Sequence, residues 1–121
     1  MALAPSKAYR TKENIPVPEW ENMKVTLREP SGDAWVKFRE IINPEIAEGD
    51  EAPKLTAAQT FIRNKEADVV LFIDVLLDDS GERVFSDDDQ ALVSKIYGPV
   101  HSRLLSQAIN LGMSQEEAGK P

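Results

Sequence analysis

The sequence contains no cysteine and a single histidine. Without cysteine, disulfides, thiolate nucleophiles and cysteine-ligated zinc or iron–sulfur centres are excluded. Basic residues are also in the minority, because 14 Lys and Arg stand against 21 Asp and Glu, and the formal net charge is −7. This balance argues against partners such as nucleic acid or an anionic membrane, since both require clustered cations. It favours a protein partner that carries basic residues.

Long hydrophobic runs are absent as well. The longest apolar stretch covers residues 69–77 and is interrupted by Asp74, whereas a membrane span needs roughly 20 apolar residues. The first ten residues lack the apolar segment of a signal peptide. A length of 121 residues corresponds to one ordinary domain. We therefore expect a single globular domain of the cytoplasm.

A β-hairpin is predicted near the N-terminus, after a polar and flexible stretch at residues 1–14. Residues 15–20, IPVPEW, carry two prolines, which a sheet tolerates only on an edge strand. Residues 23–28, MKVTLR, alternate between apolar and polar side chains, a pattern typical of a half-buried strand. Met23, Val25 and Leu27 form its apolar face. Glu21-Asn22 would make the turn.

The first predicted helix begins at a cap provided by Ser31 or Asp33 and ends at Asn43-Pro44. Trp35, Phe38 and Ile42 form its apolar stripe. Trp20 and Trp35 are candidates for interface anchors or for core residues, and the helical spacing of Trp35 favours the core. Residues 45–54 are predicted to form an acidic loop.

The second predicted helix begins with the capping-box pattern Thr56–Gln59 and continues through residues 69–77. The β-branched residues of the last segment would suit a buried strand equally well. We interpret it as helix because no Gly or Pro interrupts residues 61–77. Such a helix is apolar nearly all round and must be covered on more than one side. We therefore expect this segment to be exposed on a lone chain and covered by self-association or by a partner.

The acidic residues that follow this segment suggest either a cation site or turn and cap chemistry. Neither Asp78 nor Gly81 gives the ligand spacing of an EF-hand loop. The residues are explained more simply by a turn at 78–81 and by Ser86 as an N-cap, with Asp87, Asp88 and Asp89 in the first helical turn. Asp74 is either a buried acid with a raised pKa or, as we favour, the partner of a nearby Arg.

The last amphipathic segment runs from Asp87 to about Leu111. Its apolar residues recur every three or four positions: Leu92, Ile96, Val100, Leu104, Ala108 and Leu111. Gly98-Pro99 interrupts it, so a kink or two helices are expected there. Gly112 is predicted to cap its C-terminus, and residues 113–121 are predicted to be a disordered tail. His101 has no acid partner nearby in sequence, so we expect no catalytic residue.

Two stretches resemble one family. The sequence VPEWENMKVTLRE, residues 17–29, is similar to the N-terminal signature of tail assembly chaperones of long-tailed bacteriophages. The sequence LLDDSGERVFSDDDQALVSKIYGPVHSRLLSQAINL, residues 76–111, resembles the second signature of that family. The resemblance covers roughly residues 17–111, with the acidic loop unmatched. Relatives often carry a glycine where this chain has Glu21-Asn22.

The resemblance implies a non-enzymatic protein without a cofactor or metal. Such chaperones bind the tape measure protein, keep it soluble and help recruit tail tube subunits. They often self-associate, and they leave before the tail is finished, so they act in the host cytoplasm and are absent from the virion. A ribosomal frameshift often produces a longer form that binds the tube protein, and Gly119-Lys120 is a candidate position for it.

We thus predict a mainly α domain with a small N-terminal β-hairpin, spanning residues 15–112 and containing three to four helices. A second interpretation is another phage structural part, such as a connector or tail-terminator subunit. A third is a small metal-dependent enzyme using Asp74, Asp78 and residues 87–89. The predicted partner and oligomer surface consists of apolar side chains: Trp20, Val69, Phe72, Ile73, Leu76, Phe85, Leu92 and Ile96.

Overall fold

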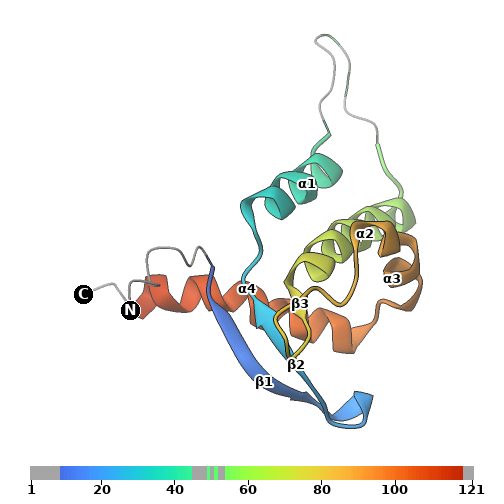
Figure 1. The fold of residues 1–121 in the computed structure, drawn as a ribbon. Helices are drawn as coiled ribbons and strands as arrows, with labels where there is room; N and C mark the ends of the chain where they lie inside the picture. The colour runs from blue at the N-terminus through green and yellow to red at the C-terminus, as the bar shows by residue number, and fades with distance from the viewer. Residues whose placement is uncertain (1–8, 45–48, 50, 52–53, 119–121) are drawn as a thin grey trace.

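The computed structural model describes residues 9–44, 49, 51 and 54–118. In this part of the chain a small antiparallel sheet packs with four α-helices, so the predicted α+β class is confirmed (Figure 1). Most of the predicted acidic loop and the Gly119-Lys120 pair lie outside the described residues. A third, short strand was not predicted.

The predicted β-hairpin is confirmed. Strand β1, Thr11–Val17, pairs antiparallel with β2, Met23–Arg28, and lies at the edge of the sheet, where its proline is tolerated. The strand therefore includes residues 11–14, which we had expected to be flexible. A 3₁₀ turn, Pro18–Trp20, leads into Glu21 and Asn22, which both adopt left-handed backbone conformations. Met23 is 59% exposed, so the predicted burial of β2 holds only for its other apolar residues.

Helix α1, Gly32–Ile42, begins as predicted, because Ser31 Oγ accepts a hydrogen bond from the Ala34 N–H. It ends at Asn43, whose N–H donates to the Arg39 carbonyl. Small Ala34 is buried, whereas Trp35 is 39% exposed. The prediction that Trp35 belongs to the core is therefore wrong.

Helix α2, Ala57–Val75, confirms the predicted capping box: the Thr56 N–H donates to Gln59 Oε1, and the Gln59 N–H donates to Thr56 Oγ1. The helical interpretation holds as far as Val75. The next two residues form β3, Leu76–Leu77, which pairs antiparallel with β2. The chain thus passes directly from the central helix into the sheet.

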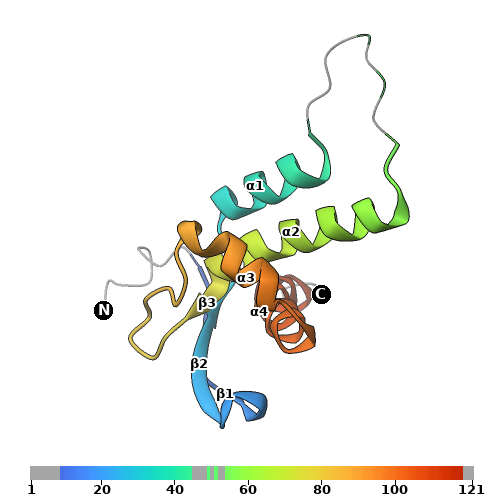
Figure 2. The same cartoon turned by 90° about the vertical axis from the view of Figure 1, so that its right-hand side faces the viewer.

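The apolar segment at residues 69–77 forms the centre of the core. The β-hairpin, helix α3, Gln90–Ile96, and helix α4, Pro99–Ala118, surround it (Figures 1 and 2). The expectation that a lone chain leaves this segment exposed is wrong, because elements distant in sequence cover it. Four predicted surface residues are consequently buried: Val69, Phe72, Ile73 and Leu76.

Gly98-Pro99 separates α3 from α4, which confirms the predicted break. The apolar stripe is buried at Leu104 and Ala108 but exposed at Leu92 and Ile96. Gly112 lies inside α4 rather than after its end, so its predicted role as a C-cap is wrong. A Cβ at this position would lie 2.5 Å from Glu29 Oε2, the end of a flexible side chain, which would have to shift to accommodate it. The helix extends through residues 113–118 of the predicted tail.

Candidate functional site

An uncharged groove of about 430 Å³ lies between the tip of the hairpin, the loop after β3 and the junction of α3 with α4. Apolar side chains and one imidazole line it: Trp20, Met23, Val25, Leu76, Val84, Phe85, Ile96 and His101. Met23, Val84 and Ile96 are each about half exposed. The groove therefore offers apolar surface to a protein partner, the kind of surface that marks interaction sites.

Four of the eight predicted surface residues line this groove: Trp20, Leu76, Phe85 and Ile96. Leu92, which is 51% exposed, lies one helical turn before Ile96 on α3. The three others are buried in the core: Val69, Phe72 and Ile73.

Sequence reasoning missed four lining residues. Met23 and Val25 were placed on the buried face of β2, and His101 was weighed only as a catalytic base. Val84 lies between the predicted turn at 78–81 and the predicted N-cap at Ser86, and it is 46% exposed. Their common signal, proximity to Trp20 and Phe85 in space, is set by tertiary packing and is not visible in the local pattern.

His101 packs among aromatic rings at one wall of the groove. Its ring centroid lies 5.2 Å from that of Phe72 and 5.5 Å from those of Trp20 and Tyr97. His101 Nδ1 accepts a hydrogen bond of 3.0 Å from the Gly98 N–H. Burial lowers the pKa of this imidazole. The side chain therefore joins the helix junction to the hairpin through this hydrogen bond and its contact with Trp20.

An ion pair fixes the hairpin tip against α4. Glu19 accepts two hydrogen bonds of 2.8 Å from the guanidinium of Arg103. These bonds lower the pKa of Glu19 to about 2. Because Trp20 follows Glu19 directly, this bidentate pair helps to set the position of one wall of the groove.

The acidic segment at residues 78–89, which follows β3, has the turn and cap structure predicted for it. Asp78 Oδ1 accepts hydrogen bonds from the N–H groups of Ser80 and Glu82, and Gly81 has a φ of 85°. The Ser86 N–H donates to Asp89 Oδ2 over 2.8 Å, at the start of the short 3₁₀ helix Asp87–Asp89 that precedes α3. In the described ranges, no three His, Cys, Asp or Glu side chains gather as a cation site.

Asp74 has the predicted arginine partner. Its Oδ2 lies 2.7 Å from Arg28 Nη2 and accepts a hydrogen bond of 2.7 Å from the Ser31 N–H. Asp74 Oδ1 also accepts from Ser31 Oγ. One carboxylate thus joins the end of β2 and the start of α1 to α2, which is a structural role.

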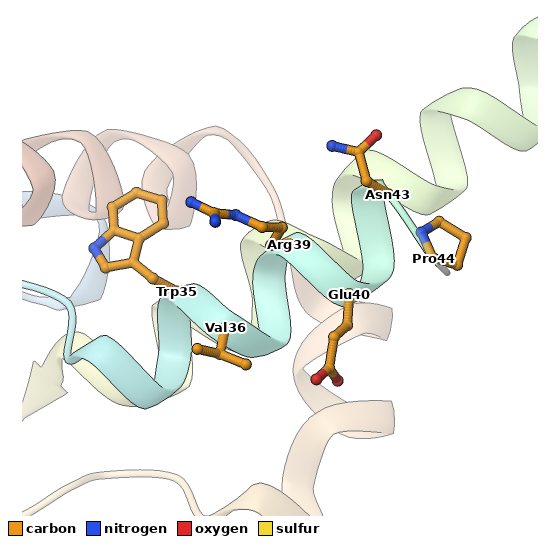
Figure 3. Close-up of a pocket in the computed structure, with 6 residues that line it drawn as sticks. All are labelled: Trp35, Val36, Arg39, Glu40, Asn43 and Pro44. Atoms are coloured by element: carbon orange, nitrogen blue, oxygen red, sulfur yellow. The ribbon is translucent and has the colours of Figure 1, made fainter. Parts of the chain in front are cut away.

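A second apolar surface lies on the helices that extend from the body. A hollow of about 690 Å³ follows the outer side of α1 and is lined by Trp35, Val36, Arg39, Glu40, Asn43 and Pro44. Figure 3 shows Trp35 and Arg39 rising from one side of α1, with Glu40 pointing to the opposite side. Phe61 and Ile62, in the first turns of α2, are 69% and 53% exposed.

Exposed apolar surfaces of this kind on a small α+β domain are typical of protein-binding modules. Comparison with known proteins gives the particular family: the family model described as "Phage tail assembly chaperone" matches residues 1–121. The chain therefore belongs to the phage tail assembly chaperones, whose role is non-enzymatic.

A solved structure supports this assignment. The chain is similar to the tail assembly chaperone of bacteriophage HK97, with 47% sequence identity and a TM-score of 0.76. The match covers 91% of this chain and 92% of that chain. No curated protein matches. Among the described residues, no helix has the length and apolar character needed to cross a membrane.

Proposed function

We propose that this chaperone binds the tape measure protein of the phage tail and keeps it soluble until the tail tube forms around it. The observation that carries the proposal is the uncharged groove between the hairpin and α3, which offers half-exposed apolar side chains on an otherwise highly charged chain. A long apolar client would be shielded by such a surface, while the net charge of −7 would keep the complex in solution.

The proposal includes self-association and recruitment of tail tube subunits. Two separate apolar surfaces, the groove and the outer side of α1, allow one chain to contact more than one neighbour. A longer, frameshifted form would supply further contacts with the tube protein. The chaperone would act in the host cytoplasm and leave before the virion is complete.

Co-expression with the tape measure protein tests the central claim. We expect the tape measure protein to remain in the soluble fraction only when the chaperone is present, and to co-purify with it. A tape measure protein that is equally soluble alone, or that never co-purifies, would contradict the proposal.

Mass spectrometry of purified virions separates the proposal from a role as a connector or tail-terminator subunit. A chaperone should be absent from mature particles and present in lysates of infected cells. Stoichiometric recovery of the chain from virions would show that it is a structural subunit instead.

A further inference from the structure

We propose that the groove receives a basic amphipathic helix of the partner. The apolar side chains of this helix would lie in the groove, and its Lys or Arg side chains would lie against the acidic residues of the segment 78–89. This inference rests on the proposed function and specifies the chemistry of the segment that the chaperone recognises. Its occupant is a helix of another protein rather than a second copy of this chain.

The apolar geometry fits a helix. Leu92 and Ile96 are spaced by four residues on α3 and are 51% and 47% exposed, so they extend the apolar surface of the groove along the helix axis. Met23 and Val84 contribute half-exposed side chains to the groove itself. An apolar stripe beside a groove matches the apolar face of an amphipathic helix, whose anchors recur every three or four residues.

The segment after β3 favours a basic partner by its charge. Residues 78–89, which carry the lining residues Val84 and Phe85, contain six acidic residues and one arginine, a formal charge of −5, whereas the single cations Lys24 and Lys95 adjoin the lining residues Met23 and Ile96. Lys37 and Arg83 pair with Asp87. The exposed side chains of Asp79, Glu82 and Asp88 form no ion pair within the described ranges. They remain available to Lys or Arg side chains that flank an apolar face.

The same charge disfavours a second copy in the groove. Each copy carries a net charge of −7, so an approach to the acidic rim brings like charges together. A basic helix is instead attracted by the acidic residues beside the groove, which also fix its position along the groove, while its apolar side chains fill the groove.

A fluorescence titration tests this inference directly. The chain has two tryptophans, and Trp35→Phe leaves Trp20 in the groove as the single reporter. The probes are three synthetic helical peptides of equal length: Leu/Lys amphipathic, Leu/Glu amphipathic, and Lys/Ser without an apolar face. We expect the Leu/Lys peptide to change the Trp20 emission saturably. Its affinity should be at least about tenfold higher than the affinity of either of the other two peptides. Equal binding of the Leu/Glu peptide, or no change with any peptide, would overturn the inference.

A matched pair of variants assigns the binding to the groove. Ile96→Ser changes a groove residue that is 47% exposed, and Leu55→Ser changes a residue just before α2 that is 39% exposed and lines neither apolar surface. We expect Ile96→Ser to weaken Leu/Lys binding about tenfold or more, as for a central contact residue, and Leu55→Ser to leave it unchanged. Circular dichroism verifies that both variants are folded. Equal effects of the two changes would contradict the assignment.

Two further readouts separate this inference from the proposed function. If tape measure protein co-purifies equally with Ile96→Ser and with the unaltered chain, the function stands and the groove is not its site. If the Leu/Lys peptide binds but tape measure protein never co-purifies, the groove does bind basic amphipathic helices, and the proposal that the tape measure protein is the partner is wrong. Loss of self-association in Ile96→Ser, measured by sedimentation without peptide, would show that a second copy occupies the groove and would overturn the inference.

Discussion

Among single residues, Asp74 joins three elements of the fold through its side chain. Its carboxylate accepts hydrogen bonds from Ser31 and pairs with Arg28, with side-chain exposures of 15% for Asp74 and 21% for Arg28. We expect Asp74→Ala to lower the free energy of unfolding by about 2–3 kcal/mol, because it leaves the Ser31 N–H without its acceptor and removes the carboxylate that pairs with the partly buried Arg28. Urea denaturation measures this loss. Asp74→Asn, which retains an acceptor for Ser31, should lose less, and equal losses would contradict the role of the hydrogen bond.

His101 predicts a pH dependence of stability. Burial lowers its folded-state pKa below the usual 6.5, so the unfolded chain binds more protons than the folded chain in this range. Its contribution to stability is therefore complete above pH 6.5 and is lost as the pH falls through the lowered pKa. As the chain has one histidine, the imidazole resonance in an NMR titration reports this pKa without ambiguity. A midpoint at or above 6.5 would contradict the burial of the ring.

Urea denaturation of His101→Gln provides the matched control. As the pH falls below 6.5, the free energy of unfolding should decrease less in His101→Gln than in the unaltered chain. Asp68, whose pKa is raised by burial, contributes with the opposite sign in both proteins. The difference between the two proteins therefore isolates the histidine.

At the scale of elements, the hairpin contains a strained turn. Glu21 has a φ of 54°, a left-handed conformation that costs an ordinary side chain about 1–2 kcal/mol. We expect Glu21→Gly to raise the free energy of unfolding by about 0.5–1 kcal/mol, because the gain exceeds the added flexibility of the unfolded chain. Thermal unfolding measures the change. A lower melting temperature for Glu21→Gly would contradict it, and Asn22→Ala, at a φ of 59°, should be destabilising.

Local patterns predicted the elements well where the physics that forms them is itself local. The capping box at Thr56, the N-cap at Ser31 and the break at Gly98-Pro99 each depend on a few neighbouring residues, and all are present. The end of α2 was missed, because Leu76 becomes a strand residue only through its pairing with Leu27, which lies far away in sequence.

At the scale of the whole molecule, apolar character identified candidate surface residues but not which of them the fold would bury. Phe72 and Ile96 both fit an apolar stripe, yet Phe72 is buried against the rings of Phe85, Tyr97 and His101 while Ile96 remains 47% exposed. The difference arises from how α3 and α4 fold back over α2. Trp20, Phe85 and Ile96 therefore lie at the groove, whereas most of the central segment is buried.

Net charge gives the last prediction, because it acts with opposite sign on two kinds of association. Self-association brings copies of charge −7 together and should strengthen when salt screens their repulsion. Binding of a basic helix at the acidic rim should weaken under the same screening. Between about 0.1 and about 1 M NaCl, where the Debye length falls from about 10 to about 3 Å, light scattering should show larger assemblies while the Leu/Lys peptide binds less tightly. A monomer throughout this range would contradict self-association, and a peptide complex that tightens with salt would show that the rim does not select a basic partner.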